Sequence, residues 1–315
     1  MRSRLRLLAK ETCLRFERYG ISEPKLSSEY LLASAFYRTT WNEFMKDPPK
    51  ELDSRCMKRF DEFCRKRIER MPIQYIIGEW DFHMLRNVLI EPPVLIPRPE
   101  TEELVDIAAE SIESIRRRRS DRDEPIRILD ACSGSGVVGI ALLKLFPESS
   151  GVRVVGCDLV REAIHLASRN AKRFGVESRY VPVRSRIEHL PELTVDDRDG
   201  GGGPFDLIVS NPPYILQKDM NALDPEVASY EDPRALCGGV RGLDVIEEIL
   251  RTAKHLVSGV DTPIVMEVDA SHPKVMKKWL RSTELDHEVN YVEWRRDRSD
   301  RPRFCLFRTK EPTAA

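Results

Sequence analysis

The sequence predicts an α/β protein in which a mostly parallel, doubly wound sheet follows an N-terminal helical region. From residue 126 onward, short apolar segments alternate with helix-like stretches, which is the pattern of βαβ units. The last two segments follow each other closely, so we expect them to form an antiparallel hairpin. The seven expected strands are "IRILDA", "VRVVGCD", "SRYVPV", "FDLIVS", "PIVMEVD", "EVNYVEW" and "RFCLFR", with a Gly-rich loop at 196–204 before the fourth.

The part of the chain before the sheet divides into two regions. Residues 1–72 are expected to form a helical domain, because apolar residues recur on one helical face of "CMKRFDEFCRKRIERM" and a serine could cap "SSEYLLASAFY". Residues 73–95 mix aromatic and β-branched residues with Gly and Pro, which predicts a β-hairpin connector. The remaining residues, 96–315, would form the α/β domain.

Composition excludes several classes of protein. Hydrophobic residues make up 41% of the chain, enough for a core, and no run approaches the roughly 18 apolar residues of a membrane span. The seven cysteines are scattered, without CxxC pairs or histidines at metal spacing, so we expect reduced thiols in an intracellular compartment and no metal site.

Charge is unevenly distributed along the chain. Residues 1–70 hold 17 Lys/Arg and 11 Asp/Glu, a balance of 17 − 11 = +6, although the whole chain has a net charge of −1. A basic head could face RNA or an acidic protein, or it could be an ordinary solvated helical surface. The Arg-rich start, "MRSRLRLLAK", fits either a mitochondrial presequence or the first turn of a helix.

A nucleotide-binding turn is predicted in "ILDACSGSGVVGIALL". Gly134, Gly136 and Gly139 satisfy G-x-G-x-x-G, and glycines let the backbone approach a ligand at a helix N-terminus. Asp158 closes the next strand, where a carboxylate can accept both hydroxyls of a ribose. Taken alone, these features also fit a NAD enzyme.

An acidic residue before the glycines helps to decide which cofactor the turn binds. Asp130 ends the first strand, where it can orient the turn or face a ligand cation. The segment resembles the D-x-G-x-G-x-G turn of class I S-adenosylmethionine methyltransferases, with Cys132 in place of the first Gly. This resemblance implies that S-adenosylmethionine is the cofactor, held by Asp158 and by the turn residues Asp130, Cys132, Ser133, Gly134, Ser135 and Gly136.

The fourth strand ends abruptly in "NPPY", at Asn211, Pro212, Pro213 and Tyr214. Prolines cannot donate to a sheet, and the carboxyl ends of parallel strands meet at one edge, so this motif should share a crevice with the Gly-rich turn. The Asn211 oxygen and neighbouring backbone carbonyls can accept from a planar NH₂ group, whose lone pair then points towards a methyl donor. The Tyr214 ring can stack on that group.

The combined motifs resemble the HemK/PrmC family, the protein-(glutamine-N5) methyltransferases of peptide-chain release factors, and most of all its mitochondrial animal branch. The resemblance covers most of residues 15–308 and includes "RMPIQYIIGEWDF", "VLIPRPETEELV", "FDLIVSNPPYI" and "SYEDPRALCGGVRGLDVI". It implies a Rossmann-like, seven-stranded methyltransferase domain. It also implies a release-factor substrate, methylated on the Gln of its Gly-Gly-Gln loop and gripped by the helical head, in the mitochondrial matrix or alternatively the cytoplasm.

Further site residues follow from this resemblance. Asn211 would lie near both ligands, and the cofactor pocket would be bordered by Pro97, Arg98, Pro99, Glu100 and Thr101. Many relatives carry an acid after the third strand that can contact the adenine amine, but Arg186 aligns there and cannot accept that bond. We therefore expect backbone and apolar contacts around Ile187 to hold the adenine.

Two other functions are compatible with parts of the sequence. A DNA or RNA adenine-N6 methyltransferase would use the same amine-holding motif, but no base-reading module is visible, so no nucleic-acid substrate is expected. A non-catalytic cofactor-binding scaffold would explain Cys132 and Arg186, whereas the intact Asn211–Tyr214 motif argues against it. Transfer to a release factor is therefore the predicted function, and no membrane contact is expected.

Overall fold

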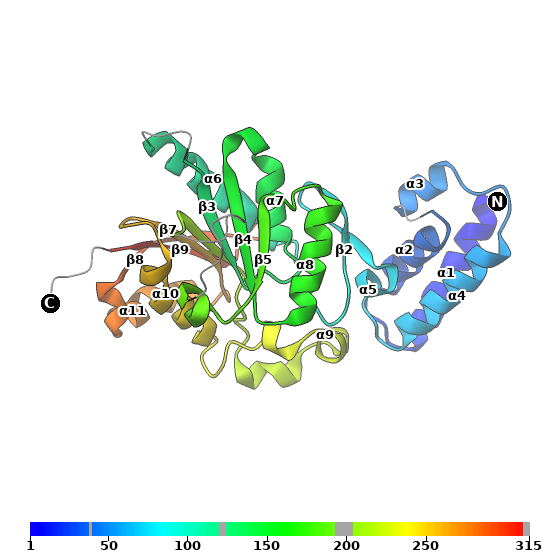
Figure 1. The fold of residues 1–315 in the computed structure, drawn as a ribbon. Coiled ribbons are helices and arrows are strands. Elements are labelled where there is room, and N and C mark those ends of the chain that lie inside the picture. The colour runs from blue at the N-terminus through cyan, green and yellow to red at the C-terminus, as the bar shows by residue number, and fades with distance from the viewer. Residues whose placement is uncertain (38–39, 120–123, 193–203, 311–315) are drawn as a thin grey trace. The chain divides into compact units, whose positions relative to one another are not determined.

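The computed structural model describes residues 1–37, 40–119, 124–192 and 204–310, so residues 196–203 of the predicted Gly-rich loop lie outside it (Figure 1). The chain forms two compact units. The helical unit comprises Met1–Trp80, Ile90–Pro92 and Leu223–Glu231. The other unit comprises Asp81–Leu89, Pro93–Ala222 and Asp232–Ala315, and it is called the catalytic unit because it carries the motifs predicted for catalysis. This division differs from the predicted one, because a segment that follows the "NPPY" motif packs with the head.

The helical unit has one apolar core. Its helices are α1 (Arg2–Arg18), α2 (Pro24–Phe36), α3 (Trp41–Lys46), α4 (Ser54–Ile68), α5 (Ile73–Ile77) and α9 (Pro225–Tyr230). The predicted face of α4 is confirmed, since Phe60, Phe63 and Cys64 are buried in this core. The Arg-rich start belongs to α1, which buries Leu5 and Phe16.

Two predicted boundaries in this region need correction. Helix α2 begins at Pro24 and not at a serine cap, because a proline in the first turn has no N–H to leave unpaired. The first five residues of the predicted hairpin connector form helix α5, which ends at Gly78 with a left-handed φ of 80°. The hairpin itself follows as β1 (Glu79–Phe82) and β2 (Leu85–Leu89).

The catalytic unit contains the predicted seven-stranded sheet. Its order is β5-β4-β3-β6-β7-β9-β8, and β9 runs antiparallel to the other six of these strands. The strands are β3 (Ile126–Ala131), β4 (Val152–Asp158), β5 (Tyr180–Arg184), β6 (Leu207–Ser210), β7 (Pro263–Glu267), β8 (Val289–Arg296) and β9 (Pro302–Thr309). The doubly wound fold and its terminal hairpin are thereby confirmed.

Helices cover both faces of this sheet (Figure 1). One face packs against α6 (Thr101–Arg118), α7 (Val137–Leu145) and α8 (Arg161–Arg173), and the other against α10 (Asp244–Leu256) and α11 (His272–Arg281). Short 3₁₀ turns complete the unit: η1 (Glu148–Ser150), η2 (Ile187–Glu192), η4 (Gln217–Ala222), η5 (Pro233–Ala235) and η6 (Glu284–His287). Chain order reverses direction at β3, so ligands are expected beyond the carboxyl ends of β3, β4 and β6. None of the helices within the described ranges is both long enough and apolar enough to span a bilayer.

Candidate active site

The Gly-rich turn leaves β3 in a left-handed conformation. Cys132, Gly134 and Gly136 have φ values of 58°, 53° and 79°, which favour glycine, and Gly136 caps the start of α7. The Asp158 carboxylate holds this turn, because its Oδ2 accepts the N–H of Gly134 at 2.9 Å. Its Oδ1 accepts the N–H of Val160 at the same distance. Burial raises the pKa of Asp158.

Asp130 holds the start of α7, directly after the turn. Its side chain is 2% exposed, and its Oδ2 accepts the N–H of Gly139 at 3.0 Å. Burial raises the pKa of Asp130 to about 8. Of the two roles considered for this residue, this contact corresponds to orienting the turn and the start of α7.

A cavity of about 230 Å³ opens beside the turn, at the carboxyl ends of the strands. Seven of its lining residues were predicted as site residues, six of them being Cys132, Gly134, Asp158, Arg186, Ile187 and Asn211. Pro213 of the motif also lines it. The structure therefore brings the two motifs to one cavity, as their places at the strand ends predicted.

Other predicted cofactor residues lie outside this lining, and their contact with the cofactor stays a prediction. They are Pro97, Arg98, Pro99, Glu100, Thr101, Asp130, Ser133, Ser135 and Gly136. Val94 and Leu95, a few residues earlier than predicted, line the cavity instead. They supply apolar surface, and they open the "VLIPRPETEELV" segment, of which only residues 97–101 were predicted to border the cofactor.

Arg186 does face the cavity, but it is engaged in ion pairs. Its Nε lies 2.6 Å from Oε1 of Glu188, and its Nη2 lies 3.8 Å from Oε2 of Glu248. Glu248, on α10, lines the same cavity and offers a carboxylate that sequence analysis missed. Ile187 is buried and lines the cavity, and its contact with adenine stays a prediction.

Asn211 and Tyr214 belong to one hydrogen-bonded chain of side chains. Asn211 Nδ2 donates to Thr101 Oγ1 at 3.1 Å, and Thr101 Oγ1 donates to Glu267 Oε2 at 2.7 Å. The Tyr214 hydroxyl donates to Glu267 Oε1 at 2.9 Å. Glu267 is 1% exposed, and burial raises its pKa against the opposing effect of these hydrogen bonds.

The backbone of the motif is enclosed by the glycine-bearing loop after it. A Cβ at Gly238 would lie 2.6 Å from the carbonyl oxygen of Pro213, and one at Gly242 would lie 2.4 Å from that of Tyr214. Only glycine permits this approach. Within the described ranges, no hydrogen bond reaches the carbonyl oxygens of Asn211 or Pro212, so both can accept from a ligand.

Glu267 is the main residue that sequence analysis missed. It closes β7 in "PIVME", and a carboxylate at the end of a fully buried strand is the same signal that identified Asp158. Thr101 was predicted to border the cofactor, and the structure places its hydroxyl between Asn211 and Glu267.

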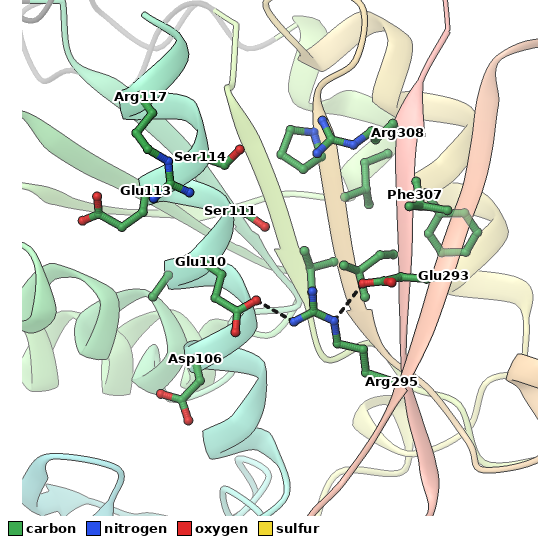
Figure 2. Close-up of a pocket in the computed structure, with 16 residues that line it drawn as sticks. Asp106, Glu110, Ser111, Glu113, Ser114, Arg117, Glu293, Arg295, Phe307 and Arg308 are labelled. Carbon is green, nitrogen blue, oxygen red and sulfur yellow. Dashed lines mark hydrogen bonds and ion pairs between the residues drawn. The ribbon is translucent and has the colours of Figure 1, made fainter.

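A larger hollow, of about 750 Å³, lies between α6 and the β7-β9-β8 edge of the sheet (Figure 2). Three of its charged groups pair with one another, because Arg295 donates to Glu110 at 2.6 Å and to Glu293 at 2.8 Å. None of the motif residues lines it. We therefore place the active site at the smaller cavity. No group of three or more His, Cys, Asp or Glu side chains within the described ranges could hold a metal ion.

Comparison with known proteins gives the family. The chain matches the PrmC N-terminal domain over residues 8–78 and a methyltransferase domain over residues 122–256. A structure of the O-methyltransferase TomG from Streptomyces achromogenes in complex with SAM is 16% identical, with a TM-score of 0.42 over 70% of this chain and 83% of that one. The match to a methyltransferase domain agrees with the predicted cofactor, S-adenosylmethionine.

Two curated relatives cover nearly the whole chain. The release factor glutamine methyltransferase of Chlorobaculum tepidum is 34% identical over 90% of this chain and 91% of its own length. The human "MTRF1L release factor glutamine methyltransferase" is 39% identical over 94% of this chain and 85% of its own length. At this identity and coverage, the protein belongs to the release factor glutamine methyltransferase family.

Proposed function

We propose that this enzyme methylates the side-chain amide nitrogen of the glutamine in the Gly-Gly-Gln loop of a peptide-chain release factor. The observation that carries the proposal is the orientation of Asn211. Its Nδ2 is occupied by Thr101, so its Oδ1 is left to accept from a substrate NH₂. The names of the relatives support the same substrate.

The reaction needs a weakly nucleophilic NH₂ group to be held with its lone pair exposed. S-adenosylmethionine, when bound, supplies an electrophilic methyl group. Asn211 Oδ1 and the carbonyl oxygen of Pro212, to which no described residue donates, are two acceptors that can hold both N–H groups of the amide. Because these acceptors are fixed before the substrate arrives, they contribute preorganisation. The nitrogen becomes acidic as it gains the methyl group, so this chain needs no strong base beside it.

Tyr214 would hold the plane of the amide. Its ring is fixed at one end by the bond from its hydroxyl to Glu267, and the Arg303 guanidinium lies 5.9 Å from the ring centre. A ring fixed in this way can stack on the glutamine amide. The ring keeps its predicted stacking role, and the hydroxyl has a separate role as donor to Glu267.

The helical unit is the proposed grip for the release factor. Besides its basic charge, α1 exposes Leu7 and Leu14, which are 56% and 44% accessible. These leucines are seven residues apart and therefore lie on one face of the helix. Exposed apolar side chains set among basic ones fit an acidic protein surface better than a nucleic acid. We place this activity in mitochondria, on the resemblance of the chain to the mitochondrial animal branch.

Mass spectrometry of a purified release factor, incubated with the enzyme and S-adenosylmethionine, tests the proposal. We expect a single methyl group on the Gly-Gly-Gln glutamine. An unmodified glutamine beside methylated adenine in a duplex DNA or RNA control would overturn it in favour of a nucleic-acid substrate. Organelle fractionation of the tagged protein tests its location.

A further inference from the structure

We propose that Thr101 and Glu267 are positioning residues that fix which end of the Asn211 side-chain amide faces the substrate. This inference rests on the proposed function and assigns a role to two side chains outside the "NPPY" motif. Thr101 begins α6 and Glu267 ends β7, and their side chains meet beside the motif. They are 3% and 1% exposed, so water cannot substitute for either partner.

The direction of the hydrogen bonds follows from the chemistry of the groups. An ionised carboxylate only accepts, so both hydroxyls that contact Glu267 must donate to it. The proton of Thr101 is thereby committed to Glu267, and its oxygen has only lone pairs to offer Asn211. Asn211 must therefore turn its NH₂ group to Thr101 and its carbonyl oxygen to the opposite side.

The alternative orientation would oppose the reaction. With its amide inverted, Asn211 would present an NH₂ group to the NH₂ group of the substrate, and two donors would face each other. An uncommitted asparagine can exchange between the two orientations. The carboxylate of Glu267, acting through Thr101, removes this freedom before the substrate binds, which is preorganisation of the acceptor.

Paired variants of Thr101 test the proposal. Thr101→Val keeps the shape of the side chain and removes the hydroxyl, and Thr101→Ser keeps the hydroxyl. We expect Thr101→Val to lower the single-turnover rate on a release factor about 10- to 100-fold, since misplacing a reacting group by about 1 Å costs up to that much. Thr101→Ser should recover most of the rate. The affinity for S-adenosylmethionine, measured in parallel, should fall less than the rate in Thr101→Val, because Thr101 does not line the cavity.

Glu267→Gln is the second arm of the experiment. A glutamine keeps the size of the side chain but can donate from one end, so Thr101 can turn its own proton to Asn211 and invert the amide. We expect a loss of rate similar to that of Thr101→Val, and the double variant should lose little more than either single one. Thr262→Val is the matched control, because Thr262 is also buried but its hydroxyl donates to the Gly259 carbonyl, away from the motif.

The outcomes separate this inference from the proposed function. If the wild-type enzyme leaves the release factor unmodified, the proposed function fails. Thermal melting first checks that Thr101→Val is folded. If the wild-type enzyme methylates the factor and Thr101→Val does so at the same rate, the positioning role is overturned. A loss in Thr101→Val that Thr101→Ser does not recover would also overturn it, because the methyl group and not the hydroxyl would then matter.

Discussion

The carboxyl ends of β4 and β7 each carry a buried acid, and the two acids hold the active site in different ways. Asp158 accepts the backbone N–H of Gly134 in the turn and the backbone N–H of Val160, which follows Asp158 by two residues. Among the described residues, the groups that donate to Glu267 are side-chain hydroxyls, those of Thr101 and Tyr214. The proposed cofactor side is therefore fixed through the backbone. The proposed amide side is fixed through side chains that distant segments must bring together.

The difference predicts where substitutions act. A change on the amide side should lower the rate of methyl transfer and spare the affinity for S-adenosylmethionine. A change on the cofactor side should do the reverse, with a larger effect on affinity than on the rate at saturating cofactor.

Asn211→Ala should give the largest effect. It removes the acceptor for the substrate NH₂, and loss of one preorganised hydrogen bond costs roughly 100- to 1,000-fold in rate. Single-turnover methylation at saturating S-adenosylmethionine measures this. Asn211→Asp keeps an oxygen, but with Thr101 it sets two acceptors against each other unless Thr101 turns, so we expect only partial recovery. A wild-type rate for Asn211→Ala would reduce the motif to a turn.

Asp158→Ala should weaken the cofactor side. Losing a charge-assisted bond to the ribose costs on the order of 1.5–3 kcal/mol, or roughly 10- to 150-fold in affinity. Calorimetry with S-adenosylmethionine measures it. Because the carboxylate also holds two N–H groups, Asp158→Asn is the better control for the turn: it keeps one acceptor and removes the charge. Unchanged affinity in both variants would contradict the ribose assignment.

Acidic pH should lower the rate of methyl transfer through Glu267, on the amide side. Burial raises the pKa of Glu267, while Thr101, Tyr214 and the Arg303 charge act to lower it and Glu100 to raise it. Protonated Glu267 can donate to Thr101 and release the Asn211 amide, so the single-turnover rate should fall about tenfold for each pH unit below that pKa. Glu267→Gln should lack this acid limb. An acid limb that persists unchanged in Glu267→Gln would assign it to another group.

Sequence analysis found the parts of the site that are local in sequence. Each of these parts can be identified from a few consecutive residues: the turn from Cys132 to Gly136, Asp158, and the "NPPY" motif. The strand pattern then places them at one edge of the sheet. Thr101 and Glu267 could not be paired in this way, because their contact depends on how α6 packs against β7. Helix α9 was also unpredictable as part of the head, since its Glu226 is held by Arg67 of α4 at 3.1 Å.

The head gives a comparison with a smaller expected effect. Replacing Leu7 and Leu14 together by Gln should raise the KM for an intact release factor about tenfold, because an interface residue that matters contributes more than about 1 kcal/mol. The rate on a short Gly-Gly-Gln peptide should not change. Val275→Gln, an equally exposed apolar residue on α11 of the catalytic unit, is the control. Equal KM values for all three enzymes would remove the proposed contact.

Cys132→Gly should give the smallest effect, and it tests whether the turn is strained at this residue. Cys132 has a φ of 58°, a left-handed conformation that costs a side-chain-bearing residue roughly 1–2 kcal/mol. Glycine avoids that strain but loses about 0.5–1 kcal/mol through the greater freedom of the unfolded chain. Cys132→Ala is the matched variant, because it also removes the thiol and keeps the Cβ. We therefore expect Cys132→Gly to be more stable than Cys132→Ala by about 0.5–1 kcal/mol, the reverse of the usual order, in urea unfolding followed by circular dichroism. A more stable alanine variant would mean that the turn relaxes around its side chain without strain, and Cys132 would then be as suitable there as the glycine it replaces.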